Sequence, residues 1–357
     1  MKRSRMKKRR VPVGASPGTL IADPAAGRSK LRLTLISPER CKTIDKAGLA
    51  DIAANREKWS LLWLDCTGLG SVDVIQEVGR LFNLHPLALE DVVNAGQRPK
   101  VDFFDDHAFV VLSMIDDVAA HRYEQVSLFF GKKFIVTFQE RAGDPFDPVR
   151  KRLEGPAPNR LRSRGADYLA YALIDAIVDS YFPPVEAASE AVDGIEDQML
   201  HAPQQGQMQA LHELRRTAHS LKAVLWPLRD ALAALIRSEA ACVTADTKVF
   251  LNDTLDHAMR LIELVETQRD TITGLMEMHL SLSQARTNDI ISYLTIVSVV
   301  FMPLTFLVGV WGMNFDPDTS PWNMPELRAY FGYPSALVFM ALVALGLVGF
   351  FRWKKWL

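Results

Sequence analysis

The sequence predicts a membrane protein in which a mixed α/β domain is followed by long helices and two carboxy-terminal transmembrane helices. Two observations support this prediction. No Asp, Glu, Lys or Arg occurs between Asp289 and Asp316, or between Arg328 and Arg352, and each interval exceeds the ~20 residues that cross a bilayer as a helix. Before about residue 146, apolar residues form short or alternating runs, whereas the later part has the longer periodicity of helices.

The composition narrows the class of protein further. Of the 357 residues, 48% are hydrophobic and 23% are charged, which excludes disorder of the whole chain and a collagen-like structure. Because two intervals are uncharged, a wholly soluble enzyme is also disfavoured. The three cysteines, Cys41, Cys66 and Cys242, lie far apart, which argues against a disulfide scaffold and a zinc–cysteine site and fits a reducing compartment.

Residues 1–30 are expected to form a mobile basic tail. Seven of the first ten residues are Lys or Arg, and no apolar segment follows them as it would in a signal peptide. Residues 11–27 are rich in Pro, Gly and Ala. We expect this tail to lie near anionic lipid. Nucleic-acid binding is the alternative reading of such a charge run, and we expect no nucleic-acid partner.

Residues 31–145 are predicted to form the α/β domain. Strands are expected over 31–35, 61–64 and 109–112, and a hairpin over 126–138 turns at Gly131-Lys132-Lys133. Short helices are expected over 74–82 and 86–93. Gly68-Leu69-Gly70 lacks the third glycine of a dinucleotide-binding loop, so no nucleotide partner is expected.

The helical region is expected over 146–245, with helices at 166–182, 185–200 and 207–237. The first should end at Pro183-Pro184 and the third should kink at Pro227. A stalk helix then covers 246–311. It includes the first transmembrane span, 290–311, and would be on the order of 100 Å long.

The remaining segments are a loop at 312–328, the second span at 329–351 and a basic tail at 352–357. Since positive charge flanks the cytoplasmic side of membrane spans, this tail and therefore both termini are expected in the cytoplasm. The loop, which is net acidic, then lies outside. Trp311, Trp322, Trp353 and Trp356 suit the membrane interfaces.

A polar stripe follows the first span with a period of 3.5 residues. We call this stripe, together with its backward extension into the aqueous part of the helix, the polar seam. In the span it contains Asn288, Ile291, Thr295, Ser298, Met302, Thr305, Gly309 and Gly312. Its extension contains Gln284, Ser281, Glu277, Gly274, Asp270, Thr267, Glu263, Arg260, Asp256 and Asp253.

A sustained 3.5-residue period indicates helices that supercoil around a common axis. Because the seam is polar, it suits helices that surround water, with Glu277, Asp270 and Glu263 as acidic rings of a funnel. Two spans per chain cannot enclose a pore, so this interpretation requires an oligomer. Close helix packing through small residues and an exposed helix face unrelated to a pore remain alternatives.

Such a pore would suit a hydrated divalent cation. Mg²⁺ dehydrates reluctantly, so the neutral oxygens of Asn288, Thr305 and Asn314 could bind it through its waters. Acidic residues would raise the local cation concentration, whereas an anion channel would require basic rings.

Gly312-Met313-Asn314 after the first span, followed by Met324-Pro325-Glu326-Leu327, resembles the GMN and MPEL elements of the CorA magnesium/cobalt transporter family. Residues 85–91 (HPLALED), 97–100 (QRPK), 146–150 (FDPVR), 226–229 (WPLR) and 301–306 (FMPLTF) are also similar to that family. The resemblance covers residues from about 17 to 357. The segment DPDTSPWN between GMN and MPEL is an insert that departs from the family pattern.

The resemblance implies a homopentameric, funnel-shaped channel in a bacterial inner membrane. Its substrate would be Mg²⁺, with Co²⁺ and Ni²⁺ as further substrates, and it would be gated by cytoplasmic Mg²⁺. Gly312, Met313 and Asn314 would form the selectivity filter, and Leu294 would join Asn288, Ile291, Met302, Thr305 and Gly309 along the pore. The regulatory metal ligands would be Glu90 and Asp91 from one subunit and Asp253 from the next, with Asp175 as a weaker match.

Two alternatives remain open. A zinc transporter of the same superfamily keeps the terminal Asn but usually lacks MPEL, and a two-span signalling receptor would not need the polar seam. An enzyme is not expected, because His212-Glu213 lacks the second histidine of a zinc-protease helix.

Overall fold

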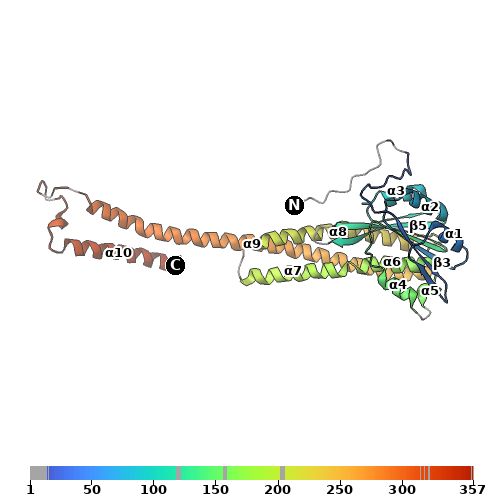
Figure 1. Ribbon diagram of the computed structural model, residues 1–357. Coiled ribbons are helices and arrows are strands. Elements are labelled where there is room, and N and C mark those ends of the chain that lie inside the picture. Colours follow the sequence, from blue (N-terminus) through green and yellow to red (C-terminus); the bar gives the residue numbers. More distant parts are fainter. Residues whose placement is uncertain are drawn as a thin grey trace. The chain divides into compact units, whose positions relative to one another are not determined.

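The computed structural model describes residues 14, 16–117, 122–155, 159–201, 206–313, 315–316, 318–320, 322–354 and 356. The chain divides into two compact units, residues 1–275 and 276–357 (Figure 1). Asn314 lies outside the described residues, as do positions 317 and 321 of the insert.

A seven-stranded sheet forms the centre of the first unit. Its order is β2-β1-β3-β7-β6-β5-β4, and β3–β7 is the only parallel pair among the described strands. The predicted hairpin is confirmed as β6 and β7. The strands are β1 (Lys30–Ile36), β2 (Cys41–Ile44), β3 (Leu61–Thr67), β4 (Lys100–Phe103), β5 (His107–Asp117), β6 (Arg122–Gly131) and β7 (Phe134–Gln139).

Both faces of this sheet are covered, because alternate residues of each strand point to opposite sides. In β3, Leu62 and Leu64 join a core with α1 (Leu49–Asn55), α2 (Val72–Phe82) and α3 (Pro86–Val93). Leu61 and Trp63 join a second core with α4 (Asp147–Glu154), α5 (Arg160–Ser163), α6 (Ala166–Asp179), α8 (Gln207–Arg237) and the start of α9 (Ala245–Trp311). The two faces therefore carry different helices.

The helix pattern differs from the prediction at one joint. α6 ends at Asp179, and α7 (Phe182–His201) already includes Pro183 and Pro184 in its first turn. Proline suits this position because the first-turn N–H groups need no intrahelical partner and φ is already helical. The proline pair therefore opens a helix instead of following one. Pro227 lies inside α8, as predicted.

The second unit contains the distal part of α9, a short 3₁₀ helix η1 (Pro325–Arg328) and α10 (Gly332–Trp353). Trp311 meets Phe339 edge-on, with ring centroids 6.3 Å apart. α9 has 67 residues, and α9 and α10 are both long and apolar enough to cross a membrane. α10 begins later than the predicted span, at Gly332 instead of residue 329.

Residues 16–29 differ from the predicted mobile tail. This amino-terminal strap packs Leu20 and Ala22 against the core beneath α2 and α3. The Gly18 N–H donates to Glu90 Oε2 at 2.7 Å, and the Gly70 N–H donates to Gly27 O at 2.8 Å. Only residues 1–13 and 15 of the predicted tail lie outside the described residues.

Candidate functional site

In the first unit, α9 separates polar from apolar residues as the seam requires. Asp253, Glu263 and Asp270 are exposed, whereas Ile272 and Leu275 between the seam positions are buried in the unit. The remaining seam residues of this stretch are also exposed: Asp256, Arg260, Thr267 and Gly274. The acid-rich face of the helix is therefore left uncovered within one chain.

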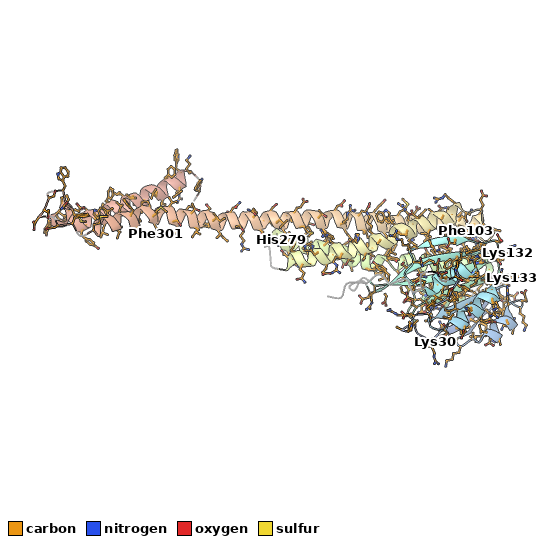
Figure 2. The ribbon with its side chains drawn as sticks, turned by 90° about the horizontal axis from the view of Figure 1, so that it is seen from above. Lys30, Phe103, Lys132, Lys133, His279 and Phe301 are labelled. Atoms are coloured by element: carbon orange, nitrogen blue, oxygen red, sulfur yellow. The ribbon has the colours of Figure 1, made fainter. Side chains whose placement is uncertain are left out.

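In the second unit, the predicted pore-lining side chains are exposed along α9. The hydroxyls of Ser298 and Thr305 donate to Leu294 O and Phe301 O, one helical turn earlier, so their oxygens remain available as acceptors. Residues off the seam, such as Phe301 (Figure 2), are exposed as well. The other exposed positions of the prediction are Glu277, Asn288, Ile291, Thr295, Met302 and Gly309.

The predicted filter begins where α9 ends. Gly312 N–H donates to Val308 O and Met313 N–H donates to Val310 O, which continues the last turn beyond Trp311. Met313 is exposed. In the following loop, Asp316 accepts from the Asp318 N–H and the Thr319 hydroxyl. The described part of the insert is thus organised as a turn around Asp316.

On α3, Glu90 and Asp91 follow from a well-defined helix start. His85 caps the helix by accepting from the Leu87 N–H, and Pro86 occupies its first position. Asp91 forms an ion pair with Lys100, with Oδ2 and Nζ 2.8 Å apart. A metal ion at Asp91 would therefore compete with a cation of the same chain.

Asp175 and Asp253 lie close together on α6 and α9. Asp175 Oδ1 accepts from the Thr254 hydroxyl at 2.8 Å. Burial raises the pKa of Asp175, and the charges of Asp179 and Asp253 add to this effect, although the Thr254 hydrogen bond opposes it. This pair of predicted ligands is thus brought together within one chain.

Two further candidate ligands, Asp179 and His257, are not among the residues predicted from the sequence. Ligand atoms of Asp175, Asp179 and His257 all lie within 4.8 Å of one another. The signal was present in the spacing, because Asp179 follows Asp175 by one helical turn, as His257 follows Asp253.

The structure does not unite Glu90 and Asp91 with Asp175 and Asp253. α3 belongs to the core on one face of the sheet, and α6 and α9 belong to the core on the other. Within a single chain the sheet separates the two groups. A metal site that contains both groups therefore needs two chains.

A buried charge network attaches α4 to the sheet. Arg150 Nη2 lies 2.6 Å from Asp65 Oδ2 and 2.7 Å from Asp144 Oδ2. Burial raises the pKa of Asp65. Burial would also raise that of Asp144, but the hydrogen bonds and charge of Arg150 lower this pKa below its ordinary value. The network explains why residues 146–150 combine apolar and charged side chains.

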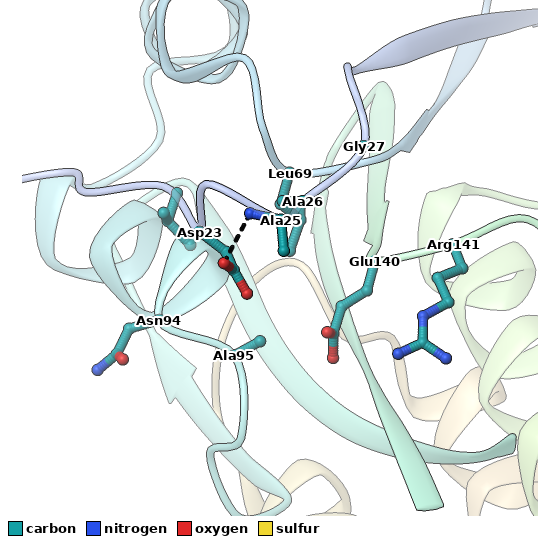
Figure 3. A pocket seen from close by; sticks show the side chains of 10 residues that line it. Asp23, Ala25, Ala26, Gly27, Leu69, Asn94, Ala95, Glu140 and Arg141 are labelled. Carbon is teal, nitrogen blue, oxygen red and sulfur yellow. Dashed lines mark hydrogen bonds between the residues drawn. The ribbon is translucent and has the colours of Figure 1, made fainter. Parts of the chain in front are cut away.

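The glycine loop after β3 is filled by the strap. A Cβ on Gly68, where φ is +92°, would lie 2.5 Å from Arg28 O, and one on Gly70 would lie 2.6 Å from Ala26 O. Beside it is a pocket of about 190 Å³, into which Asp23 and Glu140 extend from the strap and from the end of β7 (Figure 3). These glycines permit close chain packing.

Comparisons with known proteins agree with this architecture. The family model described as "CorA-like Mg2+ transporter protein" matches residues 59–355. The cobalt/magnesium transport protein CorA of Thermotoga maritima is 38% identical over 350 residues, which cover 96% of this chain and 97% of that protein. The magnesium transport protein CorA of Pasteurella multocida is 26% identical over 334 residues, 86% of this chain and 95% of that one.

The fold is shared with a solved structure. The complete structure of the CorA magnesium transporter from Methanocaldococcus jannaschii matches with a TM-score of 0.77 and 19% identity, and the match covers 92% of this chain and 99% of that one. The predicted architecture, in which an α/β domain is followed by a long helix and two carboxy-terminal apolar helices, is confirmed. This is the architecture of a two-span transporter. The chain belongs to the CorA-like Mg²⁺ transporter family.

Proposed function

We propose that this protein is a membrane channel for divalent cations, formed by a homo-oligomer. The family resemblance suggests a pentamer. The observation that carries the proposal is the polar seam of α9, which is exposed from Asp253 to Gly274, whereas Leu261, Ile272 and Leu275, which lie off the seam, are buried. The same register continues through the apolar part of α9 to Gly312. Helices arranged with this seam inward would line a continuous polar path.

Mg²⁺ is the proposed principal substrate, with Co²⁺ and Ni²⁺ as further candidates. Hydrated Mg²⁺ retains its waters, and the Asn314 amides with neighbouring carbonyl groups would bind these waters at the outer mouth. Glu277, Asp270 and Glu263 would attract the ion on the cytoplasmic side. A membrane potential supplies about 4.6 kcal/mol per 100 mV for a doubly charged ion, which is sufficient to drive uptake without another energy source.

Cytoplasmic Mg²⁺ is proposed to close the channel. The ion would bridge Glu90 and Asp91 of one subunit to Asp253 and Asp175 of the next, with Asp179 and His257 beside them. The separation of these groups by the sheet supports a site shared between subunits. Because each bridge removes repulsion between carboxylates, ~1–3 kcal/mol per site is enough for five sites together to shift the equilibrium.

The membrane orientation follows from charge. Arg352 and Lys354 follow the second apolar segment, which supports a cytoplasmic position for the carboxyl end and, after two spans, for the α/β domain. The proposed location is the inner membrane of a bacterial cell.

Uptake by proteoliposomes tests the proposal. Purified protein should admit Mg²⁺ when the interior is negative, and Co²⁺ and Ni²⁺ should follow. Protein-free vesicles and trapped dye control for leakage. Uptake of Zn²⁺ without Mg²⁺ would favour the zinc-transporter alternative, and absence of all ion flux from an intact oligomer would favour a receptor.

A further inference from the structure

A second ligand site is suggested by the way the chain leaves the sheet at β3 and β7. These neighbouring strands are parallel, so their carboxyl ends lie at the same edge. After β3 the chain enters α2 on one face, and after β7 it enters α4 on the other. Adjacent parallel strands whose connections leave on opposite faces open a crevice, and such crevices bind ligands in α/β proteins.

A cleft of about 670 Å³ occupies this position. Its walls include Thr67 at the end of β3, Gly68 after it, and residues 140–144 after β7. The volume is within the range that holds small organic ligands. We call it the switch-point cleft. It is separate from the polar seam and from the proposed regulatory acids.

One wall of the switch-point cleft carries excess positive charge. Arg28, Lys30 and Arg32 alternate along an extended segment, which places their side chains on one side. Arg32 pairs with Asp45 at 2.8 Å. Within the part of the chain that the structure describes, Arg28 and Lys30 form no ion pair.

Another part of the cleft lining, which we call the acidic wall, carries excess negative charge. Asp65, Asp144 and Asp147 all bind Arg150, at 2.6, 2.7 and 3.0 Å, so three carboxylates share one guanidinium group. Asp65 and Asp144 are deeply buried, whereas Asp147 is exposed at the entrance. This wall would attract a cationic group.

Arg150, which lines the cleft, has a buried Nε donor that lacks a hydrogen-bond partner among the described residues. Unsatisfied buried groups are costly.

We propose that the switch-point cleft binds a small zwitterion of the amino-acid class. Its anionic group contacts Arg28 and Lys30, and its ammonium group contacts the Asp144–Asp147 wall. A ligand with a single charge would be attracted by one charged part of the cleft lining and repelled by the other. This site is independent of the proposed transport function.

Titration calorimetry on the full-length protein in detergent, with divalent cations removed by chelation, tests the proposal. The probe is 4-aminobutyrate, and butyrate and butylamine represent its two halves. The zwitterion should bind with a Kd of about 1 mM or tighter, and each half at least about tenfold more weakly. Failure of the zwitterion to bind, or equal binding of either half, overturns the proposal.

Matched variants locate the binding. Lys30→Glu in the basic part of the lining and Asp147→Asn in the acidic part should each weaken binding at least about tenfold. Lys133→Glu, at the other end of β7, and Glu154→Gln, at the other end of α4, should bind like the wild type. Lys30 and Lys133 are well separated on the domain (Figure 2). All four side chains are exposed, so the fold should persist, which thermal unfolding checks. Unchanged binding by Lys30→Glu or Asp147→Asn contradicts the assignment.

Discussion

Asn314 is the residue on which the proposed ion selectivity depends, because one substitution removes an amide from every subunit of a ring. Asn314→Ala should reduce Mg²⁺ uptake at least about tenfold, the effect of ~1.4 kcal/mol at the narrowest point. The matched control is Asn323→Ala in the same loop, whose amide donates to Asp316 O and should matter less. Cobalt(III) hexaammine, which cannot lose its ligands, should block the wild type. Wild-type flux through an assembled Asn314→Ala oligomer would refute the role.

Asp253 tests the proposed gating. Asp253→Lys places a fixed cation where the bridging ion would bind, so it should protect α9 from protease without Mg²⁺. The wild type should be protected only after Mg²⁺ is added. Asp256→Lys, the same charge change on the next exposed acid of the helix, should behave like the wild type. Limited proteolysis across the millimolar range measures this, and a wild type indifferent to Mg²⁺ would eliminate the mechanism.

The Asp144–Arg150 ion pair should make the stability of the fold depend on pH. Because Arg150 lowers its pKa on folding, the ionised carboxylate stabilises the fold above its unfolded pKa of about 3.9 and loses this contribution as the pH falls further. Asp144→Asn should lower the free energy of unfolding by about 2 kcal/mol near neutral pH. The difference from the wild type should shrink only below about pH 4.

Denaturant unfolding followed by tryptophan fluorescence measures that difference. Asp147→Asn is the control, since the Asp147 side chain binds the same guanidinium group but is 75% exposed. This substitution should lower the free energy of unfolding by less than about 1 kcal/mol. Equal losses in the two variants would show that burial does not strengthen the Asp144 contact.

Residue types alone could not identify the partners of the predicted site residues. Family resemblance alone indicates Asp175 and Asp253 as metal ligands, and it does not indicate their helical neighbours Asp179 and His257, which lie one turn away. The Asp91–Lys100 ion pair joins a helix to an edge strand, and no local pattern predicts such a pairing. Local spacing therefore determines which side chains share a helix face, whereas tertiary packing determines their neighbours.

The exposure of side chains along α9 predicts which introduced cysteines are accessible to water-soluble reagents. Cysteines replacing Glu263 or Asp270 should react rapidly with a charged, water-soluble thiol reagent, because these positions are exposed. Cysteines at Ile272 or Leu275 should be protected, because these side chains are 1% and 4% exposed. The reverse reactivity pattern would show that the heptad register is wrong.

Long periodic elements were predictable, whereas the short strands at the sheet edges were not. The 31 residues of α8 carry a strong helical period, so both ends were predicted. β2 and β4 have four residues each and lie at the sheet edges, where partial exposure removes the apolar run that marks a strand. The Pro and Gly content of the strap predicts a loop or tail, whereas Leu20 and Ala22 pack against an apolar core.

For the whole molecule, the central claim is that several copies of this chain enclose one polar path. One chain leaves the acid-rich seam of α9 uncovered and holds the proposed regulatory acids on two faces of a sheet. Both features are explained by a ring of subunits. The composition predicted the membrane spans and the heptad predicted the seam, but the number of subunits follows from contacts between chains, which no single-chain pattern specifies.

The most direct test of this claim is Mg²⁺ uptake into proteoliposomes under an imposed potassium diffusion potential. The wild-type protein should admit Mg²⁺ when the interior is negative, with no nucleotide present, and the initial rate should rise with the potential because each ion moves two charges. Asn314→Ala should reduce that rate in vesicles that contain the same amount of oligomer. Absence of potential-dependent Mg²⁺ entry through an intact wild-type oligomer would contradict the channel.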